Sequence, residues 1–333
     1  MLYASGAAAL LALQNPFSAQ AAKELPGPDF IGLSQLALLL SLPLLLWKRR
    51  ARVDFFRVFR ERNSALKLAA LFAIGLAGLA LYNVGLADAH PMTISALLNL
   101  SPFWAALVAR WVVKKPIPVS PPFFFGCMLV AFAGVLIIAW SQSEPGERYS
   151  FALFLKDFVH GRAALAIPVP ALLALGATLM GKWFAKEDTM GVVAANFVVS
   201  ACLIAPAVLV IAFRRGELLT GQHHAVPIAL LIIGTFMSAA IGRALYQVAL
   251  RVTENDNGFV TLFFLLEPAL ACFISAPLSR YVASVHVRID LVFLAGLALV
   301  VAPLFVFCLK LWRSETAASR GAPAMRDDAV AAE

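Results

Sequence analysis

The sequence predicts an all-α integral membrane protein with ten transmembrane helices, built from two five-helix repeats of inverted topology. Three observations carry this prediction. Of the 333 residues, 61% are hydrophobic and only 14% are charged, whereas roughly a quarter of a soluble protein is charged. Apolar windows of about 20 residues, each able to cross a hydrocarbon core of about 30 Å, follow one another along the chain. Similar short segments also recur in the two halves.

Charges, prolines and polar clusters divide the chain into ten apolar segments. They lie at residues 2–22, 29–47, 66–87, 91–113, 122–140, 166–186, 190–213, 226–250, 257–278 and 290–312. The first resembles a signal peptide but lacks the basic region that such a peptide needs, so we interpret it as a membrane helix. Tryptophan closes four segments, as expected at a membrane interface: Trp47, Trp111, Trp140 and Trp312.

The distribution of lysine and arginine predicts the orientation. The strongest cluster follows the second span and comprises Lys48, Arg49, Arg50, Arg52, Arg57, Arg60, Arg62 and Lys67. More basic residues follow the fourth, sixth and tenth spans: Lys114, Lys115, Lys182, Lys186, Arg313, Arg320 and Arg326. All lie on one side of a ten-span protein, and the positive-inside rule assigns that side to the cytoplasm. We therefore expect a multi-pass protein of the plasma membrane (a bacterial inner membrane) with both termini cytoplasmic.

The two halves of the chain share several short segments at a nearly constant offset. Ala80-Leu-Tyr-Asn-Val-Gly-Leu86 matches Ala244-Leu-Tyr-Gln-Val-Ala-Leu250, and Ala133-Gly-Val135 matches Ala295-Gly-Leu297. Because each half holds an odd number of spans, the second half enters the bilayer in the opposite orientation, as in many transporters. The predicted domains are a first repeat at 1–140, a polar extracytoplasmic linker at 141–165, a second repeat at 166–312 and a disordered cytoplasmic tail at 313–333.

Two proline motifs occupy matching places in the halves: Ser101-Pro-Phe-Trp-Ala-Ala-Leu in the fourth span and Leu266-Glu-Pro-Ala-Leu-Ala in the ninth. With the paired Ala-Gly elements and the two five-helix halves, they resemble the EamA-like family of the drug/metabolite transporter (DMT) superfamily over residues 5–312. In the first span, Leu13-Gln14 stands before Asn15 where the family often has Trp-Gly. The resemblance implies a secondary transporter of small organic metabolites, most often an exporter, and it leaves the substrate open.

Two charged residues lie within the predicted spans and form the centre of the predicted site. At 1.5 Å per residue, Glu267 lies about 15 Å from the inner end of the ninth span, and Arg243 about 11 to 12 Å from that of the eighth. A lone charge at such depth costs about 3 kcal/mol. In the functional interpretation, Arg243 binds an anionic substrate group and Glu267 a cationic group or a proton. In the alternatives, the two residues form a structural pair, or Glu267 faces the other half.

Polar and aromatic side chains complete the predicted site. Tyr246 and Gln247 follow Arg243 by three and four residues and so share its helix face. Tyr82 and Asn83 occupy the matching places in the third span. We expect these two pairs to line opposite walls of a cavity, whereas in the alternative the tyrosines only pack between helices.

Two further candidates lie in the first half. Trp104 shares a face with Ser101 and is either a stacking surface for a planar substrate or a packing residue. Asn15 precedes Pro16 in the first span, where proline frees a backbone carbonyl. Broken helices of this kind often form binding sites in transporters. In the alternative, Asn15 bonds a neighbouring helix across a simple kink.

The predicted function is transport of an amino acid or related zwitterion, by alternating access and in the direction of export. No phosphate-binding loop for a nucleotide is present, so we expect proton coupling or exchange. A nucleotide-sugar or lipid-linked sugar carrier should have more cavity cations than Arg243 alone. A polytopic membrane transferase would need a catalytic group, for which Asp88-Ala-His90 is the only candidate. We therefore expect no enzyme.

The remaining predictions concern ligands and partners. The four cysteines, Cys127, Cys202, Cys272 and Cys308, lie singly in apolar runs, so neither a metal site nor a cofactor is predicted. The predicted partners are a small-molecule substrate and the lipid bilayer, with a homodimer left open. The net charge of +8 resides at helix ends and does not indicate nucleic-acid binding.

Overall fold

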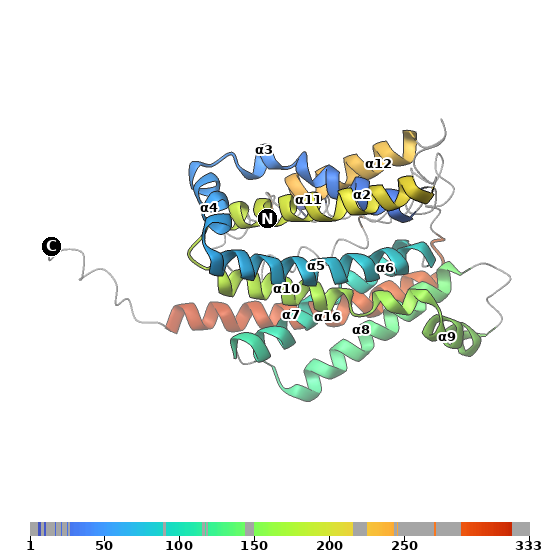
Figure 1. Ribbon diagram of the computed structural model, residues 1–333. Coiled ribbons are helices and arrows are strands. Elements are labelled where there is room, and N and C mark those ends of the chain that lie inside the picture. The colour runs from blue at the N-terminus through green and yellow to red at the C-terminus, as the bar shows by residue number, and fades with distance from the viewer. Residues whose placement is uncertain are drawn as a thin grey trace.

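The computed structural model describes residues 27–88, 91–114, 119–143, 150–215, 225–242 and 288–321. Nine single residues are described as well: Gly6, Ala7, Leu10, Phe17, Ala21, Leu25, Ile117, Leu245 and Leu270. This part of the chain is helical and contains no strand. Long helices lie side by side to form a bundle (Figure 1).

The helices follow the predicted spans closely. In chain order they are α2 (Gly27–Leu39), α3 (Leu42–Leu45), α4 (Arg49–Arg60), α5 (Arg62–Asp88), α6 (Pro91–Leu98), α7 (Ser101–Val108), the π-helix η1 (Ala109–Val113), α8 (Pro121–Gln142), α9 (Phe151–His160), the 3₁₀-helix η2 (Arg162–Ala166), α10 (Val169–Trp183), α11 (Thr189–Arg215), α12 (Ala225–Phe236), the π-helix η4 (Met237–Gly242) and α16 (Leu291–Gly321).

Within the described residues, six helices are long and apolar enough to cross a membrane. They are Arg62–Gly85, Thr93–Val113, Pro121–Gln142, Arg162–Trp183, Thr189–Ile211 and Leu291–Lys310. Two shorter apolar helices, Asp29–Leu45 and Ala225–Phe236, fall on the second and eighth predicted spans. The predicted helical membrane protein is thereby confirmed. The first and ninth predicted spans lie mainly outside the described residues, so the count of ten stays a prediction.

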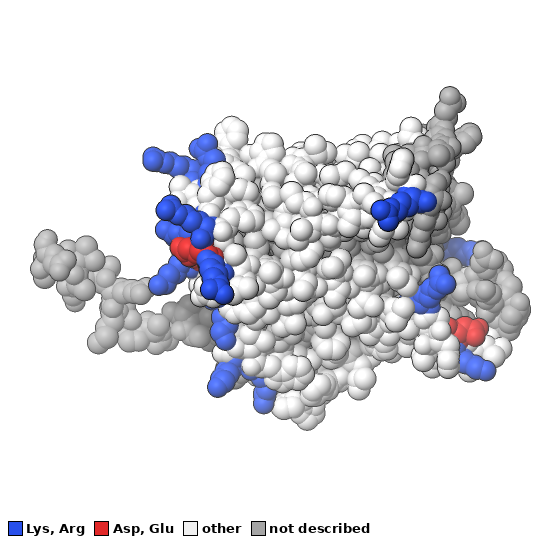
Figure 2. All heavy atoms as spheres, in the orientation of Figure 1, with Lys and Arg blue, Asp and Glu red and all other residues white. Residues whose placement is uncertain are grey.

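Charged side chains gather at the two ends of the bundle, with an uncharged band between them (Figure 2). One end carries α4 and its arginines, and we call it the α4 end. The other carries α9, and we call it the α9 end. The described cations are denser at the α4 end in this view. A band free of charge between two charged rims is the surface expected of a protein that sits in a bilayer.

The fourth predicted span is divided at its Ser-Pro motif. The first segment, α6, ends at Leu98, and α7 begins at Ser101 with a proline in its first turn. Pro102 has no backbone N–H and crowds the preceding turn, so it starts a helix more readily than it continues one. The side-chain amide of Asn99 donates to the carbonyl of Ser95 (2.8 Å), which satisfies one backbone group near the break.

The most extensive helix contact in the described structure joins α8 to α16. The helices touch at two glycines, because a Cβ atom added to Gly134 would lie 2.7 Å from the carbonyl oxygen of Gly296. Only glycines permit so close an approach of two backbones. At the α9 end, the Gln142 side chain donates to the carbonyl of Arg288 (2.8 Å) and accepts from its N–H (3.0 Å). These two helices correspond to the fifth and tenth predicted spans.

Other contacts also join helices from different halves of the chain. The second predicted span (α2) packs on the seventh (α11), and the third (α5) on the sixth (η2 and α10). A Cβ atom on Gly85 would lie 2.6 Å from that of Ala166. The first span meets the eighth at Gly234, where an added Cβ atom would lie 3.0 Å from the Cβ of Phe17. Contacts between the two halves thus hold the bundle together.

Two described α-helices and all but the last residue of η2 lie outside the predicted spans. The segment after the second span forms α4, and the predicted polar linker contains α9, which begins where the Ser150 hydroxyl accepts from the Ala152 N–H (3.2 Å). The last helix, α16, continues to Gly321, past the predicted start of the tail at residue 313.

Candidate functional site

Five of the eight predicted site residues lie outside the described residues: Arg243, Glu267, Tyr246, Gln247 and Asn15. The structure places the other three, Tyr82, Asn83 and Trp104. The predicted binding roles of Arg243 and Glu267, and the alternative in which the two residues pair, therefore concern residues outside the described part of the chain.

The helix that leads to Arg243 changes its winding just before that residue. The α-helix α12 ends at Phe236, and the chain continues as the π-helix η4 from Met237 to Gly242. Within this transition, the buried Ser238 hydroxyl donates to the carbonyl of Thr235 (3.3 Å). π-Helical turns are uncommon and often mark functional sites. The described winding therefore agrees with a special role for the segment that follows.

Asn83 on α5 is the predicted site residue with the most informative surroundings. Both polar atoms of its side-chain amide are buried and have no hydrogen-bond partner among the described residues. A buried polar atom without a partner costs about 1 to 3 kcal/mol, so native proteins rarely keep one without a reason. Asn83 precedes the end of α5 at Asp88 by about 8 Å along the helix axis. It therefore lies nearer the α9 end than the mid-membrane depth expected for a transporter site.

Ser95 on α6 lies at a depth similar to that of Asn83, because α5 and α6 are consecutive helices joined at the α9 end. It is fully buried, and its hydroxyl oxygen has no hydrogen-bond partner among the described residues. Thr93 and Asp29 are also buried in the first turns of α6 and α2. We call Asp29, Asn83, Thr93 and Ser95 the buried polar group. Its members flank the main hydrophobic core, which contains Phe30 and Ile94.

Sequence reasoning found only Asn83 in this group. Asp29 stands at the edge of a predicted span, directly after Pro26-Gly-Pro28, where an acidic residue is usually solvated. Thr93 and Ser95 follow Pro91, and small hydroxyl residues are common in membrane helices. The sequence signal that could have indicated Thr93 and Ser95 is their alternation with Ile94 in the first turn of the fourth predicted span.

Tyr82 and Trp104 are half-buried and pack against the main hydrophobic core. For both residues, this contact agrees with the alternative interpretation, in which they pack between helices and do not bind a substrate. Leu270, three residues after the unplaced Glu267, packs against the same core. Trp104 and the ninth predicted span therefore approach one hydrophobic cluster.

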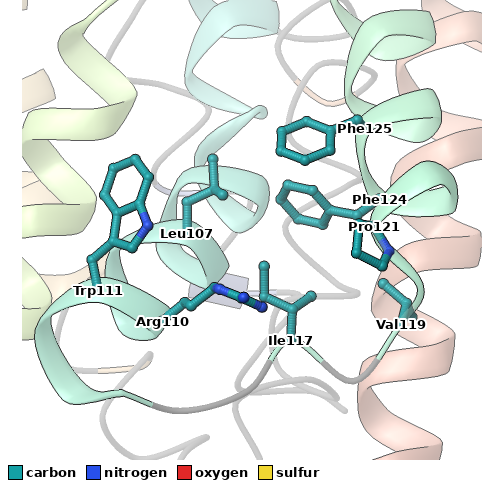
Figure 3. Close-up of a pocket in the computed structure, with 8 residues that line it drawn as sticks. All are labelled: Leu107, Arg110, Trp111, Ile117, Val119, Pro121, Phe124 and Phe125. Atoms are coloured by element: carbon teal, nitrogen blue, oxygen red, sulfur yellow. The ribbon is translucent and has the colours of Figure 1, made fainter.

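A cavity of about 230 Å³ opens between η1 and the start of α8, toward the α4 end (Figure 3). Leu107, Ile117, Phe124 and Phe125 give it apolar walls, and Arg110 is the charged residue of its lining. In Figure 3 the guanidinium of Arg110 extends between Trp111 and Ile117. The arrangement suits a carboxylate or phosphate attached to an apolar group. Sequence reasoning missed Arg110 because it lies close to Lys114 and Lys115 and merges with that basic cluster.

In the described part of the chain, no cluster of three His, Cys, Asp or Glu residues could hold a metal ion. Asp88 is the last residue of α5, and His90 lies outside the described residues. Within the buried polar group, the amide of Asn83 and the hydroxyl of Ser95 have no hydrogen-bond partner among the described residues.

Comparison with models of protein families found no match, and comparison with curated proteins found none either.

Proposed function

We propose that the protein is a secondary transporter that moves a small organic metabolite, an amino acid or related zwitterion, across the membrane by alternating access. In this proposal the α4 end faces the cytoplasm, in keeping with its denser positive charge, and the net flux is export. Energy comes from proton coupling or exchange.

The observation that carries the proposal is the pairing of helices across the two halves. The fifth predicted span crosses the tenth at Gly134 and Gly296, which the sequence repeat also matches. The third span packs on the sixth at Gly85 and Ala166, and the first meets the eighth where Phe17 faces Gly234. Each contact has the counterpart that a twofold axis in the membrane plane would generate. Inverted repeats of this kind are typical of transporters that rock one part against another.

The buried polar group supplies the second line of support. The Asn83 amide and the Ser95 hydroxyl have no partner among the described residues, and buried polar groups without partners are costly in a membrane protein because lipid offers no hydrogen bonds. A ligand that bonds Asn83 and Ser95 would offset that cost while bound. A break at Pro102, directly after α6, gives the fourth span a place to bend during such a cycle.

The runner-up is a carrier of nucleotide sugars or lipid-linked sugars. Such a substrate has one or more phosphates, which usually contact several cations. The buried polar group contains no lysine or arginine, and this favours the zwitterion. A polytopic transferase ranks below both, because its candidate group in the sequence, Asp88-Ala-His90, lacks further acidic residues nearby.

The test is uptake into liposomes that contain the purified protein, measured for labelled amino acids, drugs and nucleotide sugars. We expect an amino acid or related zwitterion to enter by counterflow exchange. Substitution Asn83→Leu should lower the transport rate at least about tenfold. It should leave thermal stability unchanged or higher, because it removes an unsatisfied buried amide. If no compound in the panel enters faster than into empty liposomes, the proposed function is wrong.

Asn63→Leu provides a matched control, because it is the same substitution on the same helix at an exposed position. It should leave the transport rate unchanged. If Asn83→Leu and Asn63→Leu transport at the same rate, Asn83 is not part of the site. That result would leave transport itself unrefuted.

A further inference from the structure

α4 runs across the ends of the long helices, between α3 and α5 (Figure 1). One face of α4 is buried against the bundle and consists of Ala51, Asp54 and Val58. The Asp54 carboxylate accepts the N–H of Asp188 (2.8 Å) just before α11. A Cβ atom on Gly191 would collide with the carbonyl oxygen of Ala51, so α4 rests directly on α11. The rotation of α4 about its own axis is thereby fixed.

The opposite face of α4 is exposed and combines arginines with apolar side chains. We call it the arginine–aromatic face and define it by its members Arg49, Arg52, Val53, Phe56 and Arg60. These residues are spaced by three and four positions, so they form one continuous surface on a helix. Phe56 is 68% exposed and Val53 is 53% exposed.

The arginines of α4 fall into two classes. Arg50 and Arg57 lie within 3.8 and 3.5 Å of the Asp54 carboxylate, so they take part in docking the helix. Arg49, Arg52 and Arg60 form no ion pair or hydrogen bond with any described residue, and all three are exposed. Three unpaired cations on one helix face repel one another, which favours an anionic partner.

The lipid surface lies within reach of this face. α5, which is apolar and long enough to span the membrane, begins at Arg62, with only Glu61 between it and α4. Trp47, 80% exposed, stands just before α4 and is the residue type expected at the level of the headgroups. An exposed phenylalanine is unfavourable in water but is stabilised among acyl chains, while arginine at the same depth reaches the phosphates. A soluble anion would satisfy the arginines but would leave Phe56 exposed.

We propose that the arginine–aromatic face binds anionic phospholipids, with the guanidinium groups of Arg49, Arg52 and Arg60 on the lipid phosphates and with Phe56 and Val53 among the acyl chains. Guanidinium and phosphate form paired, charge-assisted hydrogen bonds. Because the buried face of α4 holds the start of α11, lipid bound at the exposed face also stabilises the contact between the two halves of the chain. The inference requires insertion in a membrane but does not depend on the transported substrate.

The test uses the full-length protein in an uncharged detergent, titrated with phosphatidylglycerol or phosphatidylcholine. Native mass spectrometry measures the retained lipid, and tryptophan fluorescence follows thermal unfolding. We expect phosphatidylglycerol to bind more tightly and to raise the Tm. The triple variant Arg49→Gln, Arg52→Gln and Arg60→Gln should weaken its binding by about fivefold per arginine, on the order of a hundredfold in all.

Two further variants distinguish this site from general charge effects. The control Lys156→Gln, Arg162→Gln and Arg214→Gln removes the same charge from exposed positions at the α9 end, and it should retain binding. Phe56→Ser keeps every charge and should weaken phosphatidylglycerol binding by several-fold. A soluble glycerophosphate, which has no acyl chains, should not raise the Tm of any variant. The proposal is overturned if the two triple variants weaken phosphatidylglycerol binding equally. It is also overturned if the α4 triple variant loses less than about threefold in phosphatidylglycerol affinity, or if the soluble glycerophosphate raises the Tm.

Discussion

Replacement of Gly134 by alanine tests whether the α8–α16 contact holds the bundle together. A Cβ atom at this position would lie 2.7 Å from the Gly296 carbonyl oxygen, 2.8 Å from the Val300 nitrogen and 2.9 Å from the Leu299 carbonyl carbon. All three are backbone atoms, so no side-chain rotation can make room. To restore an ordinary contact of 3.4 Å, the helices must separate by about 0.7 Å at the crossing. Overpacking of this kind costs about 1 to 3 kcal/mol.

Gly126→Ala is the matched control for this change. Gly126 lies on the same helix, and a Cβ atom there would have nothing within 4 Å. The assay is unfolding of both purified variants in mixed micelles with increasing denaturing detergent, followed by tryptophan fluorescence. Gly134→Ala should lose about 1 to 3 kcal/mol, and Gly126→Ala should stay within about 0.5 kcal/mol of the parent protein.

The reasoning fails if Gly134→Ala unfolds at the same detergent fraction as Gly126→Ala. Such a result would mean that α8 and α16 are not in backbone contact in the membrane. Gly296→Ala offers an independent check from the other side, because its Cβ atom would lie 2.9 Å from Ile138 Cγ1 and 3.0 Å from the Gly134 carbonyl oxygen. It should destabilise to a similar degree.

Two other substitutions have matched controls. Asp54→Ala removes the acceptor of the buried Asp188 N–H and should cost about 1 to 3 kcal/mol, measured by the same unfolding assay. Glu61→Ala breaks the exposed pair with Arg57 and the hydrogen bond that Glu61 accepts from the Ser64 hydroxyl (3.1 Å), and it should cost about 1 kcal/mol; an equal cost for both would contradict a docking role for Asp54. Phe307→Ala removes a buried ring whose centroid lies 4.9 Å from the ring centroid of Phe103 and 5.5 Å from that of Phe124. This variant should cost about 3 to 5 kcal/mol. Phe305→Ala on the same helix is the control, because Phe305 is 50% exposed and should change stability by less than about 1 kcal/mol. If the two phenylalanine variants unfold together, the aromatic cluster does not hold α7, α8 and α16 in place.

The features that could be predicted from the sequence are those encoded locally. Hydrophobic windows predict spans because a membrane helix must be apolar over its whole length. The fourth span was predicted as one segment at 91–113, and its break between α6 and α7 is explained by Pro102, because proline cannot continue the preceding backbone hydrogen bonds. The matching Ala-Gly elements were recognised as a repeat, and their glycines do meet at the α8–α16 crossing.

The features that could not be predicted depend on tertiary contacts. α4 was interpreted only as a basic marker of orientation, since nothing near it in the sequence shows that Asp54 meets Asp188, 134 residues away. The buried polar group was found only at Asn83 for a similar reason. Whether Asp29 or Ser95 is solvated or buried depends on which helices cover it, and periodicity does not specify that.

Orientation poses a separate problem for a chain in which two inverted repeats are predicted. A perfect inverted repeat presents the same loops to both sides of the membrane, so its orientation must be set where the halves differ. The connection between the second and third predicted spans contains α4 with five arginines. The corresponding connection in the second half follows α11 and contributes Arg214 and Arg215. α4 therefore breaks the symmetry in charge, and the docking of Asp54 at the start of α11 ties this asymmetric segment to the packing of the two halves. Three of the α4 arginines that predict the orientation, Arg49, Arg52 and Arg60, are thus the same residues for which anionic-lipid binding is proposed.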